Sequence, residues 1–266
     1  MIFKNKQELL NYFSDEAKAV AHYEQLRWGG TICCPHCAST KVYRTNRGFS
    51  CGEKLCLKKF TAKTGTIFED SKIPFKTWFI AIYECTSNKK GKSSHQLARD
   101  LGVTQKTAWF ILHRIREMLQ DKEPVLLCGT VSVDEAYVGG ATGNKHKRKV
   151  KRDESGSVID VKSVVFGAVE KQGKAILRVV DSATKAQILP VLEKHIEKGS
   201  FMVSDESTLY TNLSRTHQYG HASVNHSKGE YVRDGYHTNN IENVFSLLKR
   251  GIDGIYHQVS PEHLNS

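Results

Sequence analysis

The sequence predicts a multi-domain chain in which a small cysteine-rich module and an α-helical module precede an α/β domain with a mixed five-stranded sheet. Two cysteine pairs lie within residues 34–56. Apolar residues then recur at helical spacing through residues 72–122, whereas short apolar runs of strand type begin only after residue 128. At 266 residues the chain is also long for one domain.

The composition favours a polyanionic partner. The chain carries 39 Lys and Arg against 28 Asp and Glu, which gives a formal net charge of +11 at pH 7. Such an excess favours nucleic acid, and the alternative is a merely basic protein. The chain has no run of about 18 apolar residues, so we expect no membrane span. Residues 1–8 lack the apolar segment of a signal peptide. We expect a cytosolic protein whose seven cysteines serve as metal ligands or free thiols.

Residues 1–30 are expected to form a helical segment that takes no part in the chemistry. Apolar residues recur at helical spacing from residue 6 to residue 28. Ser14-Asp15 would begin a second helix, and Gly29-Gly30 would end it.

The cysteine-rich module, residues 31–63, has the spacing of a zinc ribbon. Thiolates on two tight turns can occupy the four corners of a tetrahedron, as a closed structural zinc site requires. The ligands of this one Zn²⁺ would be Cys34, Cys37, Cys51 and Cys56. The second pair has four intervening residues where two are usual, and Cys33 is an alternative to Cys34. The competing interpretation is four unrelated buried thiols.

Residues 72–122 predict a helix-turn-helix preceded by an aromatic helix at residues 74–85. Gly102 would form the turn between the two helices, Val103 would pack inside this turn and Thr104 would cap the second helix. In this motif the second helix enters the major groove with its N-terminal residues foremost. The residues expected to contact DNA are Gln105, Lys106 and Thr107. The residues expected to pack inside are Leu97, Ala98, Leu101, Ala108, Ile111, Leu112 and Ile115. A plain helical hairpin is the alternative.

Residues 139–152 predict a mobile loop, because they combine glycines with a high density of like charge. Six of the nine residues 144–152 are basic: Lys145, Lys147, Arg148, Lys149, Lys151 and Arg152. We expect the loop to become ordered when it binds a phosphate backbone. The alternative is a disordered, solvent-exposed loop that binds nothing.

The last domain, residues 128–266, has the element order β-β-β-α-β followed by a helix. The predicted elements are strands 130–138, 163–170, 175–180 and 201–205 and a helix 184–198 that ends at Gly199. Three antiparallel strands, a crossover helix and a parallel strand make an RNase H-like sheet. This topology places a residue of the first strand beside the end of the fourth.

Three acidic residues are expected to converge in this domain. Asp134 stands mid-strand, where an apolar residue is the default, and burying it is costly unless a cation meets it. Asp205 ends a short apolar run, and Glu242 lies in a helix predicted over residues 237–250. Lys249 lies two helical turns after Glu242, roughly 10 Å along the axis, where it could contact phosphate. The alternatives are ordinary strand-end and solvated helix acids.

Hard divalent cations prefer such oxygen ligands, and Mg²⁺ keeps several waters, so few carboxylates suffice. Two Mg²⁺ or Mn²⁺ ions about 3.5–4 Å apart can activate the attacking oxygen and stabilise the leaving oxygen of a phosphodiester. Asp134 would bridge both ions, while Asp205 and Glu242 would complete one site each.

The chain resembles insertion-sequence DDE transposases that join an N-terminal zinc ribbon and helix-turn-helix to an RNase H-like domain, the ISXO2-like transposase family. The resemblance, from about residue 8 to the end, rests on Arg27-Trp28, Cys34-Pro-His-Cys37, Thr64-Gly-Thr-Ile-Phe68, Val133-Asp-Glu-Ala-Tyr-Val-Gly-Gly140, Ser204-Asp-Glu206, His237-Thr-Asn-Asn-Ile-Glu242 and Leu248-Lys-Arg250. Near the end, Tyr256-His-Gln258 departs from the family's Tyr-His-His.

The resemblance implies metal-dependent DNA cleavage at element ends and transfer of the 3′-hydroxyl strand into a target. It implies double-stranded DNA partners (terminal inverted repeats and target), a homodimer or larger synaptic complex, and a cytoplasmic, nucleoid-associated bacterial protein. It adds His237 and Asn239 to the candidate catalytic residues and Arg250 to the DNA contacts. Because some relatives use Asn as the third residue, Asn239 or Asn240 could share or take the role of Glu242.

Two other functions are compatible with the same residues. One is a DNA-binding regulator whose last domain is an inactive remnant, because the resemblance implies a further helix beyond Ser266. The other is an RNase H-like, structure-specific nuclease that cuts without terminal repeats.

Overall fold

The computed structural model describes residues 3–120, 126–139, 162–171, 173–205, 210, 219–224 and 238–264. The chain divides into two compact units, Met1–Gln120 and Asp121–Ser266. Among the described residues, no helix has both the length and the apolar character that crossing a membrane demands.

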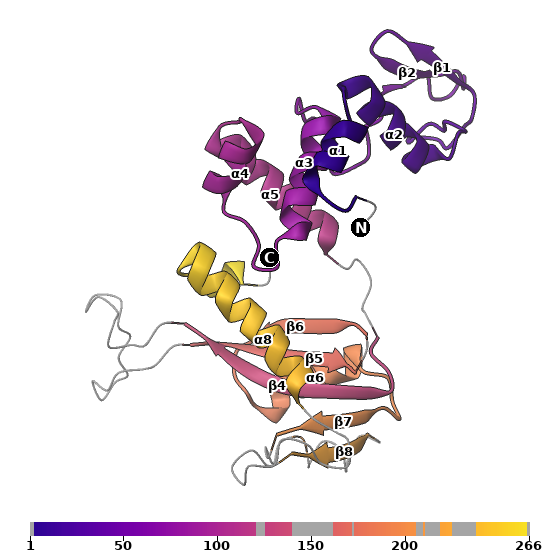
Figure 1. The fold of residues 1–266 in the computed structure, drawn as a ribbon. Coiled ribbons are helices and arrows are strands. Elements are labelled where there is room, and N and C mark those ends of the chain that lie inside the picture. The colour runs from indigo at the N-terminus through magenta and orange to yellow at the C-terminus, as the bar shows by residue number, and fades with distance from the viewer. Residues whose placement is uncertain are drawn as a thin grey trace, which may run out of the picture. The chain divides into compact units, whose positions relative to one another are not determined.

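The first unit combines helices with a small antiparallel sheet (Figure 1). Its described helices are α1 (Lys6–Tyr12), α2 (Glu16–Trp28), α3 (Phe75–Ser87), α4 (Ser94–Leu101) and α5 (Gln105–Leu119). Its strands, in sheet order, are β1 (Val42–Thr45), β2 (Gly48–Cys51) and β3 (Lys59–Phe60). The strands belong to the cysteine-rich module, so this module and the helices share one unit.

Local capping residues set the bounds of these helices as the sequence predicts. Asp15 begins α2 and Thr104 begins α5, each by accepting the backbone N–H three residues on. Gly29 and Gly102 end α2 and α4 in the left-handed conformation, with φ of 60° and 64°, which glycine adopts without strain. All the residues expected to pack inside α4 and α5 are buried except Leu101, which is half-buried against the same core.

The second unit is built on a mixed five-stranded sheet, in the order β6-β5-β4-β7-β8. The strands are β4 (Thr130–Val138), β5 (Ser163–Glu170), β6 (Ala175–Val180), β7 (Phe201–Ser204) and β8 (Gly220–Ser223). β4, β5 and β6 pair antiparallel, whereas β7 pairs parallel to both β4 and β8. The described helices are α6 (Lys185–His195) and α8 (Asn239–Gly251), followed by a π-helical turn (Ile252–Tyr256) and a 3₁₀ turn (Pro261–His263).

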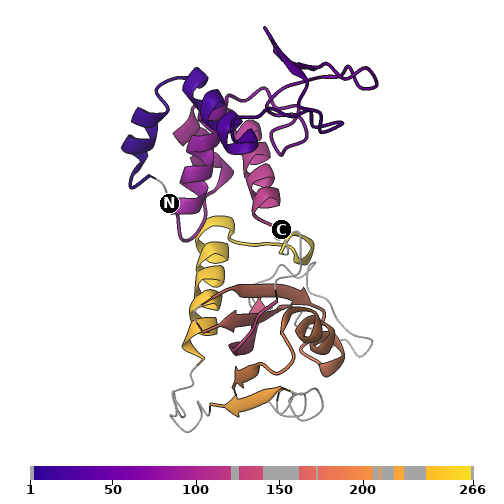
Figure 2. The ribbon, with the colours of Figure 1, turned by 90° about the vertical axis from the view of Figure 1, so that its right-hand side faces the viewer.

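α6 and α8 cover opposite faces of this sheet (Figure 2). Odd-numbered residues of β4, such as Val131 and Val133, pack in the core that includes α6. Even-numbered Ala136 and Val138 pack in the core that includes α8. This alternation follows from the period of two in a strand, so Asp134 shares the α8 face.

The predicted helix over residues 184–198 is too long. α6 ends at His195, and Ile196 adopts an extended conformation that bridges in parallel to Leu127. Leu127 donates its backbone N–H to His195 O and accepts that of Glu197, so backbone pairing ends the helix before Gly199. The helical pattern extended to Ile196 because this side chain is buried in the same core.

Candidate active site

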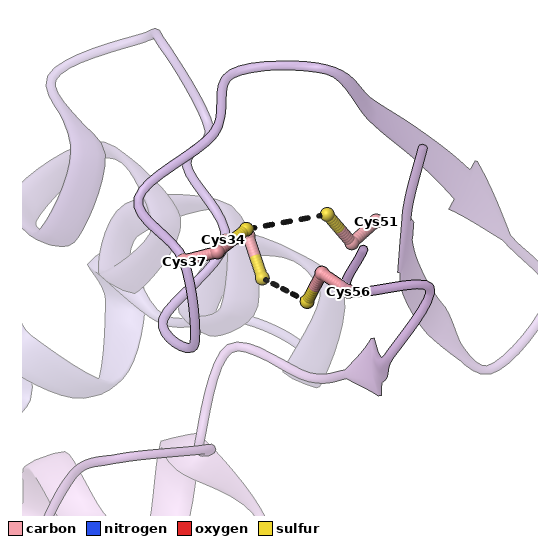
Figure 3. A group of neighbouring side chains, drawn as sticks. All are labelled: Cys34, Cys37, Cys51 and Cys56. Atoms are coloured by element: carbon pink, nitrogen blue, oxygen red, sulfur yellow. Dashed lines mark hydrogen bonds between the residues drawn. The ribbon is translucent and has the colours of Figure 1, made fainter. Parts of the chain in front are cut away.

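The four predicted cysteines form a compact cluster in which the candidate ligand atoms lie within 4.8 Å of one another (Figure 3). The sulfurs of Cys34 and Cys56 are 3.8 Å apart, and those of Cys37 and Cys51 are 3.6 Å apart. A tetrahedral site with Zn–S bonds of about 2.3 Å needs sulfurs about 3.8 Å apart. The cluster therefore fits a structural zinc ion, and Cys33 is not part of it.

Tight turns hold these thiols in place. Cys34 O accepts the backbone N–H of Ala38 at 2.8 Å, which closes the first turn. In the second turn Glu53 donates its backbone N–H to the Cys51 sulfur at 3.5 Å and accepts that of Cys56 at 2.9 Å. Backbone donors directed at sulfur favour the thiolate, the form that binds zinc.

The register between β4 and β7 brings the first two carboxylates together. The ladder pairs Ser132 with Val203 in parallel. Two residues further along both chains, the same register sets Asp205, the first residue after β7, level with Asp134. The predicted parallel pairing of the first and fourth strands is thus confirmed, and the adjacency of the two carboxylates stays a prediction.

The third carboxylate arrives on α8, which packs closely on the sheet. Asp134 pairs with Gly167 of β5, and a Cβ at Gly167 would lie 2.5 Å from Ile241 Cδ1 and 2.7 Å from Phe245 Cζ. The absence of a side chain at Gly167 therefore lets α8 approach the strand pair that carries Asp134. Glu242 follows Ile241 and is exposed.

The pKa of Asp134 is raised above its usual value, and its causes include the charges of the other predicted site residues. Burial raises it, and the negative charges of Asp205 and Glu242 raise it further, to about 6. The backbone N–H of Glu135, 2.7 Å from Asp134 Oδ1, and the charge of Lys249 oppose the shift. Three carboxylates with this mutual repulsion are a donor set of the kind that hard divalent cations take.

The acidic residues nevertheless do not form a closed cluster. Among the described residues, only the cysteine group has three or more candidate ligand atoms close enough to hold a metal ion. Asp134 and Asp205 are half-buried, whereas Glu242 and Lys249 are exposed. The three carboxylates are thus suitable metal ligands, but they do not form a closed metal site.

The residues near the start of α8 differ in what they contact. Thr238 Oγ1 donates a hydrogen bond to Glu242 Oε1 at 2.8 Å. Asn240 donates its amide to Lys171 O at 3.1 Å, in the turn after β5. Asn239 is exposed at the first position of the helix, and His237 lies outside the described residues.

Sequence reasoning missed a hydrogen-bonded pair on the opposite face of β4. Tyr210 is fully buried, and its hydroxyl donates to Glu135 Oε1 at 2.5 Å. Burial raises the pKa of Glu135, and the negative charge of Asp134 raises it further. A signal was available, because two consecutive acids on a strand must face opposite sides.

The predicted DNA contacts are only partly described. Gln105 and Lys106 are exposed on α5, although the Gln105 amide donates to Ser94 Oγ at 2.9 Å, and Thr107 is half-buried. Trp109, one turn after Gln105, is a large exposed residue that sequence reasoning did not select. Arg250 donates to Ser246. The basic residues Lys145, Lys147, Arg148, Lys149, Lys151 and Arg152 lie outside the described residues.

Comparisons with known proteins point to mobile elements. The family model of the ISXO2-like transposase domain matches residues 126–266, and that of a transposase zinc-ribbon domain matches residues 14–59. A relative from Halobacterium salinarum, named "Uncharacterized protein in transposable element ISH50", is 27% identical over 250 residues, or 90% of this chain and 83% of the relative.

Two solved structures show a weak likeness. The crystal structure of the Mos1 strand transfer complex has 13% identity and a TM-score of 0.26, over 78% of this chain and 76% of that chain. The crystal structure of a pre-cleavage Mos1 transpososome has 12% identity and a TM-score of 0.21, over 80% and 82%. Similarity at this level carries no argument about this chain.

Proposed function

Because the chain belongs to the family of ISXO2-like transposases, we propose that it cuts DNA at the ends of an insertion sequence and joins the free 3′-hydroxyl to target DNA. The observation that carries this proposal is the packing of α8, which bears Glu242 and Lys249, against the strand pair that carries Asp134, together with the parallel pairing of β4 with β7, the strand that Asp205 follows. These residues come from β4, the end of β7 and α8, so only the folded domain assembles them.

In this proposal the three carboxylates hold Mg²⁺ or Mn²⁺. When bound, two such ions supply Lewis acidity to the attacking and leaving oxygens of the phosphodiester. Asp134 is the central ligand, because it is half-buried in the middle of β4 and the charges of both other acids raise its pKa. Lys249, exposed on the same helix as Glu242, binds the phosphate and offsets its negative charge.

The remaining parts deliver DNA to this site. We assign α4 and α5 as a helix-turn-helix, with Gln105, Lys106 and Thr107 foremost in the major groove. We assign the five-stranded sheet as RNase H-like, on the element order of β4, β5, β6, α6 and β7. The basic residues of segment 144–152 and Arg250 then bind phosphates, and a homodimer or larger assembly pairs two element ends.

Substitution of single carboxylates tests the proposal. Asp134→Asn, Asp205→Asn and Glu242→Gln should each slow Mn²⁺-dependent nicking of element-end DNA by about 10³-fold or more, equivalent to about 4 kcal/mol. Binding of the same DNA should persist. Glu262→Gln, at an exposed acid in the 3₁₀ turn, is the matched control and should cut normally.

The alternatives predict other outcomes of this assay. Nicking that survives in all three variants contradicts the metal role of the carboxylates. Bound but uncut element ends in the wild type would support the DNA-binding regulator, and cutting without terminal repeats would support the nuclease.

A further inference from the structure

Thr238 occupies the N-cap position of α8 but does not use its hydroxyl as a helix cap. In α5, by contrast, Thr104 Oγ1 accepts the backbone N–H of Thr107 at 3.2 Å, as N-cap threonines commonly do. Thr238 has φ of −94° and ψ of 0°, and its residue surface is only 2% exposed. Its hydroxyl is therefore directed elsewhere.

That hydroxyl donates to Glu242 Oε1 at 2.8 Å, one helical turn further on. The carbonyl of Thr238 also accepts the backbone N–H groups of Ile241 and Glu242, at 3.1 and 3.2 Å. Side chain and backbone of one buried residue thus both contact Glu242. The start of α8 is held in place because Ile241, next to Glu242, is fully buried against the sheet.

An exposed glutamate has three rotatable side-chain bonds and loses much conformational freedom when it binds a metal ion. A buried donor on one carboxylate oxygen removes part of that freedom in advance. Outer hydrogen bonds of this kind orient metal-binding carboxylates in other proteins. Asn240, the neighbouring candidate, is directed at Lys171 O and has no comparable contact with the acids among the described interactions.

We propose that Thr238 is a positioning residue that orients the Glu242 carboxylate for metal binding. This inference rests on the proposed function, and it selects Glu242 over Asn240 as the third ligand. Thr238 does not itself contact the metal or the DNA. A purely structural role, in which Thr238 only stabilises the start of α8, is the competing interpretation.

The test compares Thr238→Val, which keeps the shape and loses the hydroxyl, with Thr238→Ser, which keeps the hydroxyl. Mn²⁺ binding to the full-length protein without DNA is measured by electron paramagnetic resonance. Thr238→Val should raise the dissociation constant for Mn²⁺ about tenfold, and Thr238→Ser should stay within about twofold of wild type. Thr104→Val is the matched control, because it removes a threonine hydroxyl at the capped helix and should leave Mn²⁺ binding unchanged.

A double-mutant cycle separates positioning from folding. In a Glu242→Gln background, Thr238→Val should have no further effect on Mn²⁺ binding if the hydroxyl acts through Glu242. Equal Mn²⁺ affinity of Thr238→Val and wild type overturns the inference, as does an equal loss in both backgrounds. If the valine variant fails to fold, Thr238→Ala is judged by the same criteria.

The failures of the two proposals are distinguishable. Wild-type protein that binds Mn²⁺ no better than Asp134→Asn contradicts the proposed function. Wild-type protein that binds Mn²⁺ and cuts DNA, together with an unaffected Thr238→Val, contradicts only the role of Thr238.

Discussion

The cysteine cluster and the three candidate acidic residues of this chain both have side chains suited to metal ions, but they are arranged differently. Four cysteines within residues 34–56 place their sulfurs at separations close to those of a zinc tetrahedron. Asp134, Asp205 and Glu242 are far apart in sequence, and only strand register and helix packing could bring them together. The cysteines are ready to close around an ion, whereas the carboxylates repel one another and remain partly open to solvent.

The difference follows from what each ion would do. A structural zinc site needs all its ligands from the protein and contributes directly to folding. A site for phosphodiester chemistry must keep positions for water and for the substrate, so an incomplete protein cage is expected. Local turns suffice for the first kind of site, while the second depends on the whole domain.

The largest effect should come from removing zinc. Chelation or Cys34→Ser should unfold residues 31–63, because zinc binding supplies about 10 kcal/mol or more in small zinc modules. Cys33→Ser should retain the ion, because Cys33 is outside the cluster. Mass spectrometry measures the zinc content of both variants, and circular dichroism measures their folding. A wild-type protein with fewer than one zinc per chain would contradict the proposed zinc site.

A smaller effect should come from filling the gap between α8 and the sheet. Gly167→Ala should destabilise the second unit by about 2–3 kcal/mol, because its Cβ would meet Ile241 and Phe245. Nicking should also fall, since α8 carries Glu242. Urea denaturation measures the change, and Gly254→Ala, where a Cβ meets nothing within 4 Å, is the control. An unchanged midpoint for Gly167→Ala would show that α8 does not pack as described.

The smallest effect should come from the pair behind Asp134. Tyr210→Phe removes the hydroxyl that donates to Glu135 and should cost about 1–2 kcal/mol, because a half-buried carboxylate loses its donor. Tyr137→Phe, on the same strand with 54% of the residue exposed, should change stability by less than about 0.5 kcal/mol. Equal unfolding midpoints for these two variants would contradict a stabilising role of the pair.

The sequence predicted elements best where local chemistry alone determines them. β4, β5 and β6 have the predicted bounds, because apolar alternation and turn residues define each strand. Helix ends are predicted well because a cap acts within one turn of the helix. Asp15 begins α2, Gly29 ends it and Thr104 begins α5, as predicted.

Prediction failed where distant segments decide the outcome. α6 ends early because Leu127 pairs with the residues that follow it, and no feature of the helix itself signals this. A fifth strand was expected, but its residues were not predicted. The sequence of β8, Gly-His-Ala-Ser, lacks an apolar pattern, and these residues form a strand because they pair with β7. The pair of Glu135 and Tyr210 joins residues 75 positions apart, which composition and periodicity do not connect.

The parallel ladder between β4 and β7 has a consequence for how this site tolerates change. Because side chains alternate along a strand, slippage by a single residue would carry Asp205 to the side of the sheet opposite Asp134. The register is specified by the apolar side chains that the two strands bury, such as the paired residues Val131 and Met202 in the core that includes α6. Polar replacements at these buried positions can therefore separate the two aspartates although neither aspartate is changed.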